Sequence, residues 1–381
     1  MKSDFETSEK RHLSTDSQPD MLPDYSGGMS EAERALLHGH VDGEVGGEGD
    51  GQLRGEGDGQ LRDERGDATG GLRDELGAGQ LGAHVRAALA WHESPKRSQG
   101  WDLHTHTVFS DGQCTPSEAI ELAKNAGIAG IALTDHDSAQ GWSEAEKRAR
   151  ELNMPLIRGT EITAEWGHTS VHMLAWLYDP TNEALAELFR TTRINRVRRT
   201  KKMVEMMGKK YPITWEDVLK QAGGTAQTTI GRPHIADTLV AKGLFATRSE
   251  AFLGPVSSKS EFYLPVISPQ VDEVITAVKD AGGVVAIAHA GSFARNKEIL
   301  NDQDIRHFAD LGLDALEVWH RENSPEQRVR LLKLASRLGL LVTGGSDWHG
   351  PHGKPNLLGE NLTDPQTLQA IVTRGVLPVV E

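Results

Sequence analysis

From about residue 100 onward, short apolar runs alternate with segments of helical periodicity. The apolar runs predict strands over 101–105, 129–134, 155–160, 171–177, 284–288, 314–318 and 341–344. The helical patterns predict helices that include 116–126, 142–152, 269–281, 325–338 and 365–374. Alternation of strands with helices indicates an α/β protein, built on a parallel sheet or a closed α/β barrel.

One stretch, residues 181–262, interrupts this alternation. It has helical periodicity throughout and no clear apolar run of strand length. We interpret it as a small helical insertion that divides the barrel into two parts, 98–180 and 263–381.

The first 97 residues have a different composition. Within the first 100 residues lie 18 of the 41 glycines, with 20 acidic and 11 basic residues, and the octapeptide GEGDGQLR occurs at 47–54 and again at 55–62. Such a segment buries too little apolar area to offset its chain entropy. We predict a disordered tail over 1–97, with a short helix at 83–92, and expect that removing the tail leaves activity unchanged.

Charge and cysteine content narrow the class of protein. Most of the net charge of −14 belongs to the tail, and the mildly acidic remainder argues against a surface that coats nucleic acid. The single cysteine, Cys114, excludes an intrachain disulfide and a thiolate cluster, which fits a reducing compartment. No run of 18 apolar residues is present, so we expect a cytoplasmic protein without a membrane partner, and we infer no stable protein partner.

Histidines and carboxylates gather at the ends of the predicted strands. They are His104 and His106, Asp111 in a glycine turn, Asp135, His136, Asp137, Glu161, His172 within a strand, His289, Asp347 and His349. Two histidines at i and i+2 of a strand point to the same side. The carboxyl ends of parallel strands lie at one edge of the sheet, so these side chains are expected to meet there.

This set of side chains is suited to divalent metals. Imidazole and carboxylate ligands without thiolates fit zinc, manganese or iron. The candidates exceed the four ligands that one zinc takes, which indicates two or three ions. Glu161, from a middle strand, is the candidate bridge between them.

The motifs HTHTVFSDG, TDHD, GTEIT, AHAG and SDWHG, together with His172, resemble the PHP (polymerase and histidinol phosphatase) superfamily over about 100–360. The resemblance implies a distorted seven-stranded (βα) barrel with a trinuclear centre that hydrolyses phosphoesters through a metal-activated hydroxide. Some members of the superfamily carry histidine at the position of Asp111. The aspartate form resembles the subgroup that acts on nucleotides and RNA ends.

The resemblance also implies a ligand set for each metal. The first metal would take His104, His106, Glu161 and Asp347; the second, Asp111, His136 and His349; and the third, Glu161, His172 and His289. Asp135 and Asp137 are expected to act in catalysis by orienting imidazoles, with helix capping as the alternative.

The insertion supplies candidate phosphate ligands. Arg196 and Arg199 belong to a basic helix, and the motif GRPHIA places Arg232 and His234 at a helix start, where phosphate binds readily. Nucleotide-cleaving PHP proteins carry a similar Gly-Arg-x-His motif. We expect these four residues to bind a second phosphate, His234 to assist catalysis as well, and His320 to contact substrate.

Several functions remain open at this stage. The leading expectation is a phosphoesterase that acts on a nucleoside 3',5'-bisphosphate, on the 5' end of short RNA, or on both. A phosphomonoesterase for AMP or histidinol phosphate is the alternative within the same chemistry. A non-catalytic metal-binding module is the alternative of another class, although every ligand position of the motifs is filled.

Overall fold

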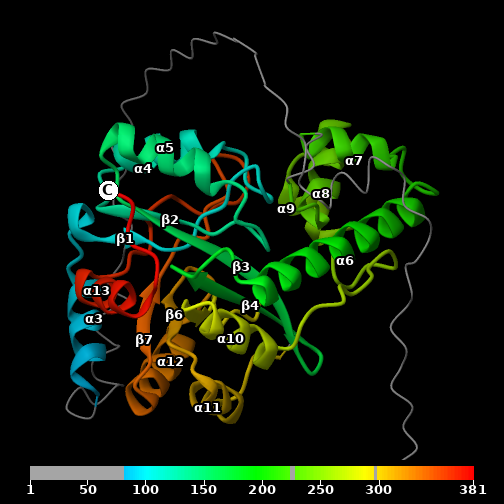
Figure 1. Cartoon of the computed structure of the whole chain (residues 1–381). Coiled ribbons are helices and arrows are strands. Elements are labelled where there is room, and N and C mark those ends of the chain that lie inside the picture. Colours follow the sequence, from blue (N-terminus) through cyan, green and yellow to red (C-terminus); the bar gives the residue numbers. More distant parts are fainter. Residues whose placement is uncertain (1–80, 224–227, 296–297) are drawn as a thin grey trace, which may run out of the picture.

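The computed structural model describes residues 81–223, 228–295 and 298–381, and seven strands of this part form one sheet in sequence order (Figure 1). The strands are β1 (Trp101–Asp102), β2 (Gly130–Leu133), β3 (Leu156–Trp166), β4 (Thr169–Trp176), β5 (Val284–Ile287), β6 (Ala315–Trp319) and β7 (Leu341–Gly344). They occur where the apolar runs predict them. The octapeptide repeat lies outside the described residues.

The sheet is mixed and not parallel. β4 runs antiparallel to both β3 and β5, whereas the other neighbouring pairs are parallel. The reason is the tight connection between β3 and β4, in which Gly167 adopts a positive φ of 59°. A connection this short can only reverse the chain, because a parallel neighbour requires a long crossover.

The two ends of the sheet approach each other. Thr105, beyond β1, forms a parallel bridge with Trp348, beyond β7, so the sheet is nearly closed into a barrel. Helices surround it: α4 (Pro116–Asn125), α5 (Trp142–Leu152), α10 (Val271–Asp280), α11 (Asp302–Leu311), α12 (Pro325–Leu338) and α13 (Pro365–Arg374). The distorted (βα) barrel predicted from the sequence is confirmed.

The folded part of the chain begins earlier than the predicted boundary at residue 97. Helix α3 (Ala83–Glu93) packs against α12 and α13, and Val85 and Leu89 are buried in the main hydrophobic core. The imidazole of His92 stacks on the indole of Trp319 with ring centroids 3.8 Å apart. A short 3-10 turn, η2 (Arg97–Gln99), then leads into β1. Residues 81–97 are therefore part of the barrel's packing.

The segment 181–262 contains helices, as its periodicity predicts, and no strand among its described residues. They are α6 (Glu183–Met207), α7 (Trp215–Gln221), α8 (Arg232–Ala241) and α9 (Arg248–Leu253). These helices share a hydrophobic cluster of their own and lie together at one side of the barrel (Figure 1). In the described part of the chain, none of the helices has the length and apolarity that crossing a membrane requires.

Candidate metal centre

His104 and His106 lie just beyond β1, where the chain stays extended between its neighbours. The amide of His106 donates to Trp348 O at 2.9 Å, and the amide of Asp347 donates to His104 O at 2.8 Å. This pairing with the segment after β7 keeps the chain extended, which directs both imidazoles to the same side, and their Nε2 atoms are 3.1 Å apart. The His-x-His motif therefore presents two ring nitrogens to one point.

All the predicted metal ligands lie in one buried or half-buried cluster. Three groups within it have ligand atoms that are all within 4.8 Å of one another: His104, His106, Glu161 and Asp347; His106, Asp111 and His349; and His136, Glu161 and His172. The first group is the ligand set that the resemblance implies for the first metal. The other two depart from the implied sets, because His136 lies closer to Glu161 and His172 than to the Asp111–His349 pair.

Glu161 lies at the middle of the cluster. Its Oε2 is 3.1 Å from His106 Nε2 and 3.3 Å from His136 Nδ1. Its Oε1 is 2.8 Å from His172 Nδ1 and 3.1 Å from His289 Nε2. A carboxylate whose two oxygens face separate sets of imidazoles has the geometry of a bridge between cations.

Several polar atoms of the cluster lie close together without forming hydrogen bonds to one another, as ligands around a cation do. Asp111 Oδ1 lies 3.2 Å from His349 Nε2, yet both are buried atoms without a hydrogen-bond partner in the described structure. The same is true of Asp347 Oδ1 and His136 Nδ1. Buried polar atoms are normally satisfied. Unsatisfied oxygens and nitrogens that converge in this way fit divalent metal ions held by imidazole and carboxylate.

The pKa values within the cluster also indicate that its carboxylates attract positive charge. Burial lowers the pKa of His106, but the adjacent carboxylates of Asp347, Glu161 and Asp111 raise it overall, to about 9. Burial raises the pKa of Glu161, but the surrounding imidazoles, first His136 and then His104, hold it well below its usual range. A proton on His106 thus compensates part of the carboxylate charge that metal ions would otherwise neutralise.

The backbone is strained at this centre. Asp137, His289 and Asp347 have positive φ angles of 50°, 33° and 53° without being glycine. Such conformations cost about 1–3 kcal/mol each and persist where surrounding contacts fix them. Here they turn two predicted ligands, His289 and Asp347, toward the cluster.

Glu317 is a functional residue that the sequence reasoning missed. From β6, its Oε1 lies 3.0 Å from His104 Nδ1, and its Oε2 accepts from the amide of His289 at 2.6 Å. Both contacts are buried, and a carboxylate on the far nitrogen fixes the orientation of a metal-binding imidazole. The available signal was an acidic residue inside the apolar run of β6.

Asp135 and Asp137 do not contact imidazoles directly. Asp135 accepts from Ser110 Oγ at 2.7 Å, and Ser110 Oγ lies 3.3 Å from His106 Nδ1, so Asp135 orients His106 through a hydroxyl. Asp137 accepts from the amide of Thr163 at 2.8 Å and pairs with Arg196 Nε at 2.9 Å. Neither caps helix α5, whose N-cap is Gly141.

The predicted phosphate ligands take different positions. Arg196 is held by Asp137, and Arg199 Nη1 lies 3.7 Å from the sulfur of Met203. Arg232 lies over the rings of Phe252 and Tyr263, with its Cζ 5.5 Å and 5.3 Å from their centroids.

His234 and His320 are both buried. His234 Nδ1 accepts from the amide of Gly231, and its ring lines a cavity on another side of helix α8. His320 lies beside the cluster, with Nε2 at 3.8 Å from Asp347 Oδ2. The arginine and the histidine of the GRPH motif therefore lie in different environments, Arg232 against two aromatic rings and His234 at the cavity.

Two further cations flank the centre and were also missed. Arg295 Nη2 and Lys354 Nζ lie 2.5 Å and 2.9 Å from Asp347 Oδ2, whereas His104 and His106 face the other oxygen, Oδ1. Arg295 also contacts Glu322 at 2.7 Å. Both cations lie in loops that follow predicted ligand motifs. Their position after these motifs was the only feature of the sequence that could have indicated a role near the centre.

The comparisons with known proteins identify the family. The model of the PHP domain matches residues 102–225. The 5'-3' exoribonuclease Rnm of Salmonella typhimurium is 30% identical over 254 residues, which cover 66% of this chain and 85% of the relative. The chain belongs to the PHP family.

Other relatives of this PHP protein agree with the assignment. The 3',5'-nucleoside bisphosphate phosphatase of Chromobacterium violaceum is 28% identical, over 66% of this chain and 87% of the relative. A solved structure from Bifidobacterium adolescentis, assigned to the metal-dependent phosphoesterases, is 56% identical and superimposes with a TM-score of 0.72, covering 73% of this chain and 97% of that one. The PHP protein is therefore a metal-dependent phosphoesterase, a hydrolase of phosphoric esters.

Proposed function

We propose that this enzyme hydrolyses nucleotides that carry a second phosphate next to the scissile one. The substrate would be a nucleoside 3',5'-bisphosphate, which loses its 3'-phosphate, the 5' end of a short RNA, or both. The names of the relatives from Salmonella typhimurium and Chromobacterium violaceum cover these two substrates. Both substrates have the same arrangement, in which one phosphate is anchored and its neighbour reacts.

The observation that carries this proposal is the environment of Arg232. Among the described residues its guanidinium has no carboxylate partner; it packs on two aromatic rings and donates to Val256 O at 3.3 Å. Burial lowers the pKa of Arg232, and the nearby charges of Arg196 and Arg295 act in the same direction. A half-buried cation without a counter-ion among the described residues, beside other cations, is a favourable position for a phosphate.

This arginine group adjoins the metal centre. Arg295, which influences the charge of Arg232, contacts the predicted ligand Asp347 through Nη2. A phosphate on Arg232 would therefore lie on the side of the cluster where Arg295 contacts Asp347. That spacing favours a substrate with two neighbouring phosphates over one with a single phosphate.

The cluster residues would hold two or three divalent ions, of manganese, zinc or iron. Bound ions of this kind activate water as a nucleophile and stabilise the phosphoryl oxygens during in-line displacement. Around them, Glu317 and Ser110 hold the orientation of His104 and His106. Arg295 and Lys354 add positive charge on the Asp347 side, where phosphoryl oxygens need it.

The test is phosphate release by the manganese-loaded full chain. Adenosine 3',5'-bisphosphate, AMP, histidinol phosphate and a short 5'-phosphorylated RNA are compared for kcat/KM, with nucleotide release measured for the RNA. We expect a clear preference for the bisphosphate or the RNA. A preference for AMP or histidinol phosphate would leave a phosphomonoesterase and contradict the second phosphate site.

A variant pair assigns the preference to Arg232. Arg232→Ala should raise KM for the bisphosphate by about 10-fold or more, the scale of one charge-assisted contact, while AMP is affected little. Lys202→Ala is the control, because Lys202 is an exposed cation on α6 that pairs only with Glu205 at 3.1 Å. Equal losses on both substrates would mean that Arg232 does not bind the second phosphate. His106→Ala should remove turnover of every substrate.

A further inference from the structure

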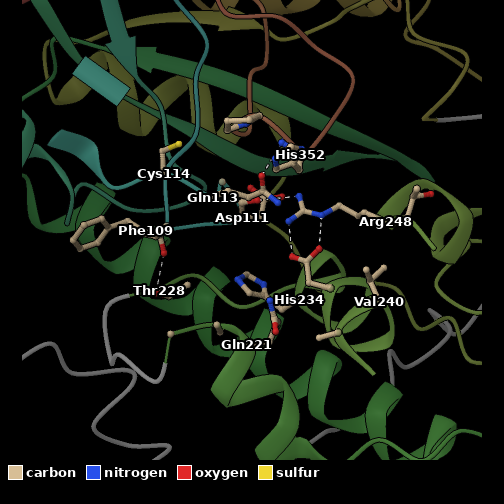
Figure 2. A pocket seen from close by; sticks show the side chains of 18 of the residues that line it. Phe109, Asp111, Gln113, Cys114, Gln221, Thr228, His234, Val240, Arg248 and His352 are labelled. Atoms are coloured by element: carbon tan, nitrogen blue, oxygen red, sulfur yellow. Dashed lines mark hydrogen bonds and ion pairs between the residues drawn. The ribbon is translucent and has the colours of Figure 1, made fainter. Parts of the chain in front are cut away.

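Helix α9 contacts the metal centre through a single buried arginine. Arg248 is 9% exposed and donates from Nε and Nη2 to the two carboxylate oxygens of Asp237, at 2.7 Å and 2.5 Å. Its remaining nitrogen, Nη1, donates to the backbone carbonyl of Asp111 at 3.0 Å. Figure 2 shows the Arg248 guanidinium beside Asp111. A bidentate pair of this kind fixes the plane of the guanidinium and hence the direction of its third donor.

Asp111, the residue that Arg248 contacts, is the predicted ligand farthest from a strand, nine residues after the end of β1. Asp111 Oδ1 faces His349 Nε2 at 3.2 Å, and its Oδ2 faces His136 Nε2 at 4.0 Å. The other predicted ligands lie on β3 or β4 or within five residues of a strand end. The loop that carries Asp111 therefore needs support from outside the sheet.

That support comes from the insertion. Thr229 donates its amide to Phe109 O at 2.9 Å, and Thr228 Oγ1 donates to Val108 O at 3.0 Å. Between these contacts and Arg248 lies a cavity of about 1100 Å³, lined by the loop on one side and by α7, α8 and α9 on the other (Figure 2). The cavity lies beside the contact between Arg248 and the Asp111 loop, so among the described residues Arg248 joins the insertion to this loop at the cavity's edge.

We propose that the Asp237–Arg248 pair is a positioning device for Asp111, through which the helical insertion sets the geometry of one metal site. Arg248 touches neither metal ligand atoms nor substrate; it acts through the carbonyl of Asp111. Loss of the pair releases the loop and weakens binding of the metal that Asp111 ligates. The group formed by His104, His106, Glu161 and Asp347 keeps its own support from the strands.

The experiment measures Mn²⁺ binding by calorimetry on the metal-free full chain, with thermal unfolding of the same samples. Arg248→Met should lower the affinity of one class of Mn²⁺ site by about 10- to 100-fold, the effect that loss of a supporting contact has on metal sites, and leave another class unchanged. Arg248→Lys keeps the charge but cannot donate to both partners, so it should give an intermediate loss. If Arg248→Met fails to fold, the Mn²⁺ affinity of Arg248→Lys tests the positioning role in its place.

Arg158→Met is the matched control. Arg158 is likewise little exposed and joins one carboxylate, Glu146 at 3.1 Å, to one backbone carbonyl, Pro378 O at 3.1 Å, without contacting a predicted ligand. It should lower thermal stability without changing Mn²⁺ affinity. Unchanged binding in the Arg248 variants, or equal changes in the Arg158 variant, would overturn the positioning role. Because the readout is metal binding, failure of the proposed nucleotide specificity would leave this result unaffected, and the reverse also holds.

Discussion

Replacing Glu317 with glutamine tests whether this buried carboxylate maintains the metal centre. Glu317 is fully buried and accepts from the amide of His289, while its other oxygen lies 3.0 Å from His104 Nδ1. Burial raises its pKa, but the charge and hydrogen bond of His104, together with the charges of His320 and His289, lower it below its usual value, so the carboxylate stays ionised. Glutamine has nearly the same shape, but it removes the charge and turns one acceptor into a donor.

The magnitude follows from these two contacts. The new amide group must face either His104 Nδ1–H or the His289 amide, and one donor then loses its partner. An unsatisfied buried donor costs about 1–3 kcal/mol, which should lower the free energy of unfolding by this amount. Metal affinity should fall by about 10- to 100-fold, or about 1.4–2.7 kcal/mol, because the imidazole loses basicity and orientation.

The assay is Mn²⁺ titration of the metal-free protein, together with urea unfolding with and without Mn²⁺. Glu326→Gln is the control, because Glu326 is exposed in the first turn of α12 and should change neither quantity measurably. If Glu317→Gln binds Mn²⁺ as tightly as the unaltered chain, Glu317 is a structural acid and the reasoning about His104 is wrong.

Two further predictions concern protons and the N-terminal region. Because the folded pKa of His106 is raised to about 9, its proton stabilises the metal-free protein fully below about pH 6.5, and this contribution is lost as pH rises through 9. Mn²⁺ must displace that proton, so its affinity should increase between pH 6.5 and 9, with proton release detectable in buffers of different ionisation enthalpy; a flat profile would contradict a protonated His106. Deleting residues 1–80 should leave turnover and urea unfolding unchanged, whereas deleting 1–97 removes buried Val85 and Leu89 and should cost several kcal/mol, at about 1.5–3 kcal/mol for each side chain. Equal stability of the two truncations would show that α3 is dispensable.

The sequence predicts those features of this protein that are local in the chain. The strands agree with their apolar runs to within a few residues at most ends, except β3, which is longer. The histidines could be singled out because imidazoles at the ends of such runs have few structural reasons to recur. The contacts of Glu317 with His104 could not be foreseen, since 213 residues separate the two and only the closing of the barrel brings them together. Arg295 and Lys354 were missed for the same reason.

The sheet is antiparallel at β4, and this feature bears on how the centre is built. In the β3–β4 hairpin, Glu161 and Thr163 share one face of β3, and His172 stands directly opposite Thr163 on that face. His172 Nδ1 therefore reaches Glu161 Oε1 at 2.8 Å from the middle of a strand and not from a loop.

A barrel of parallel strands alone would offer ligands only from the loops after the strands. Reversing β4 places the imidazole of His172 within the wall of the barrel, opposite β3, where it approaches Glu161 Oε1 together with His289 Nε2 at 3.1 Å. His106 and His136 approach the other oxygen of Glu161, at 3.1 Å and 3.3 Å. The antiparallel strand therefore supplies one of the imidazoles that surround Glu161, whereas Glu161 itself comes from β3, which runs parallel to β2.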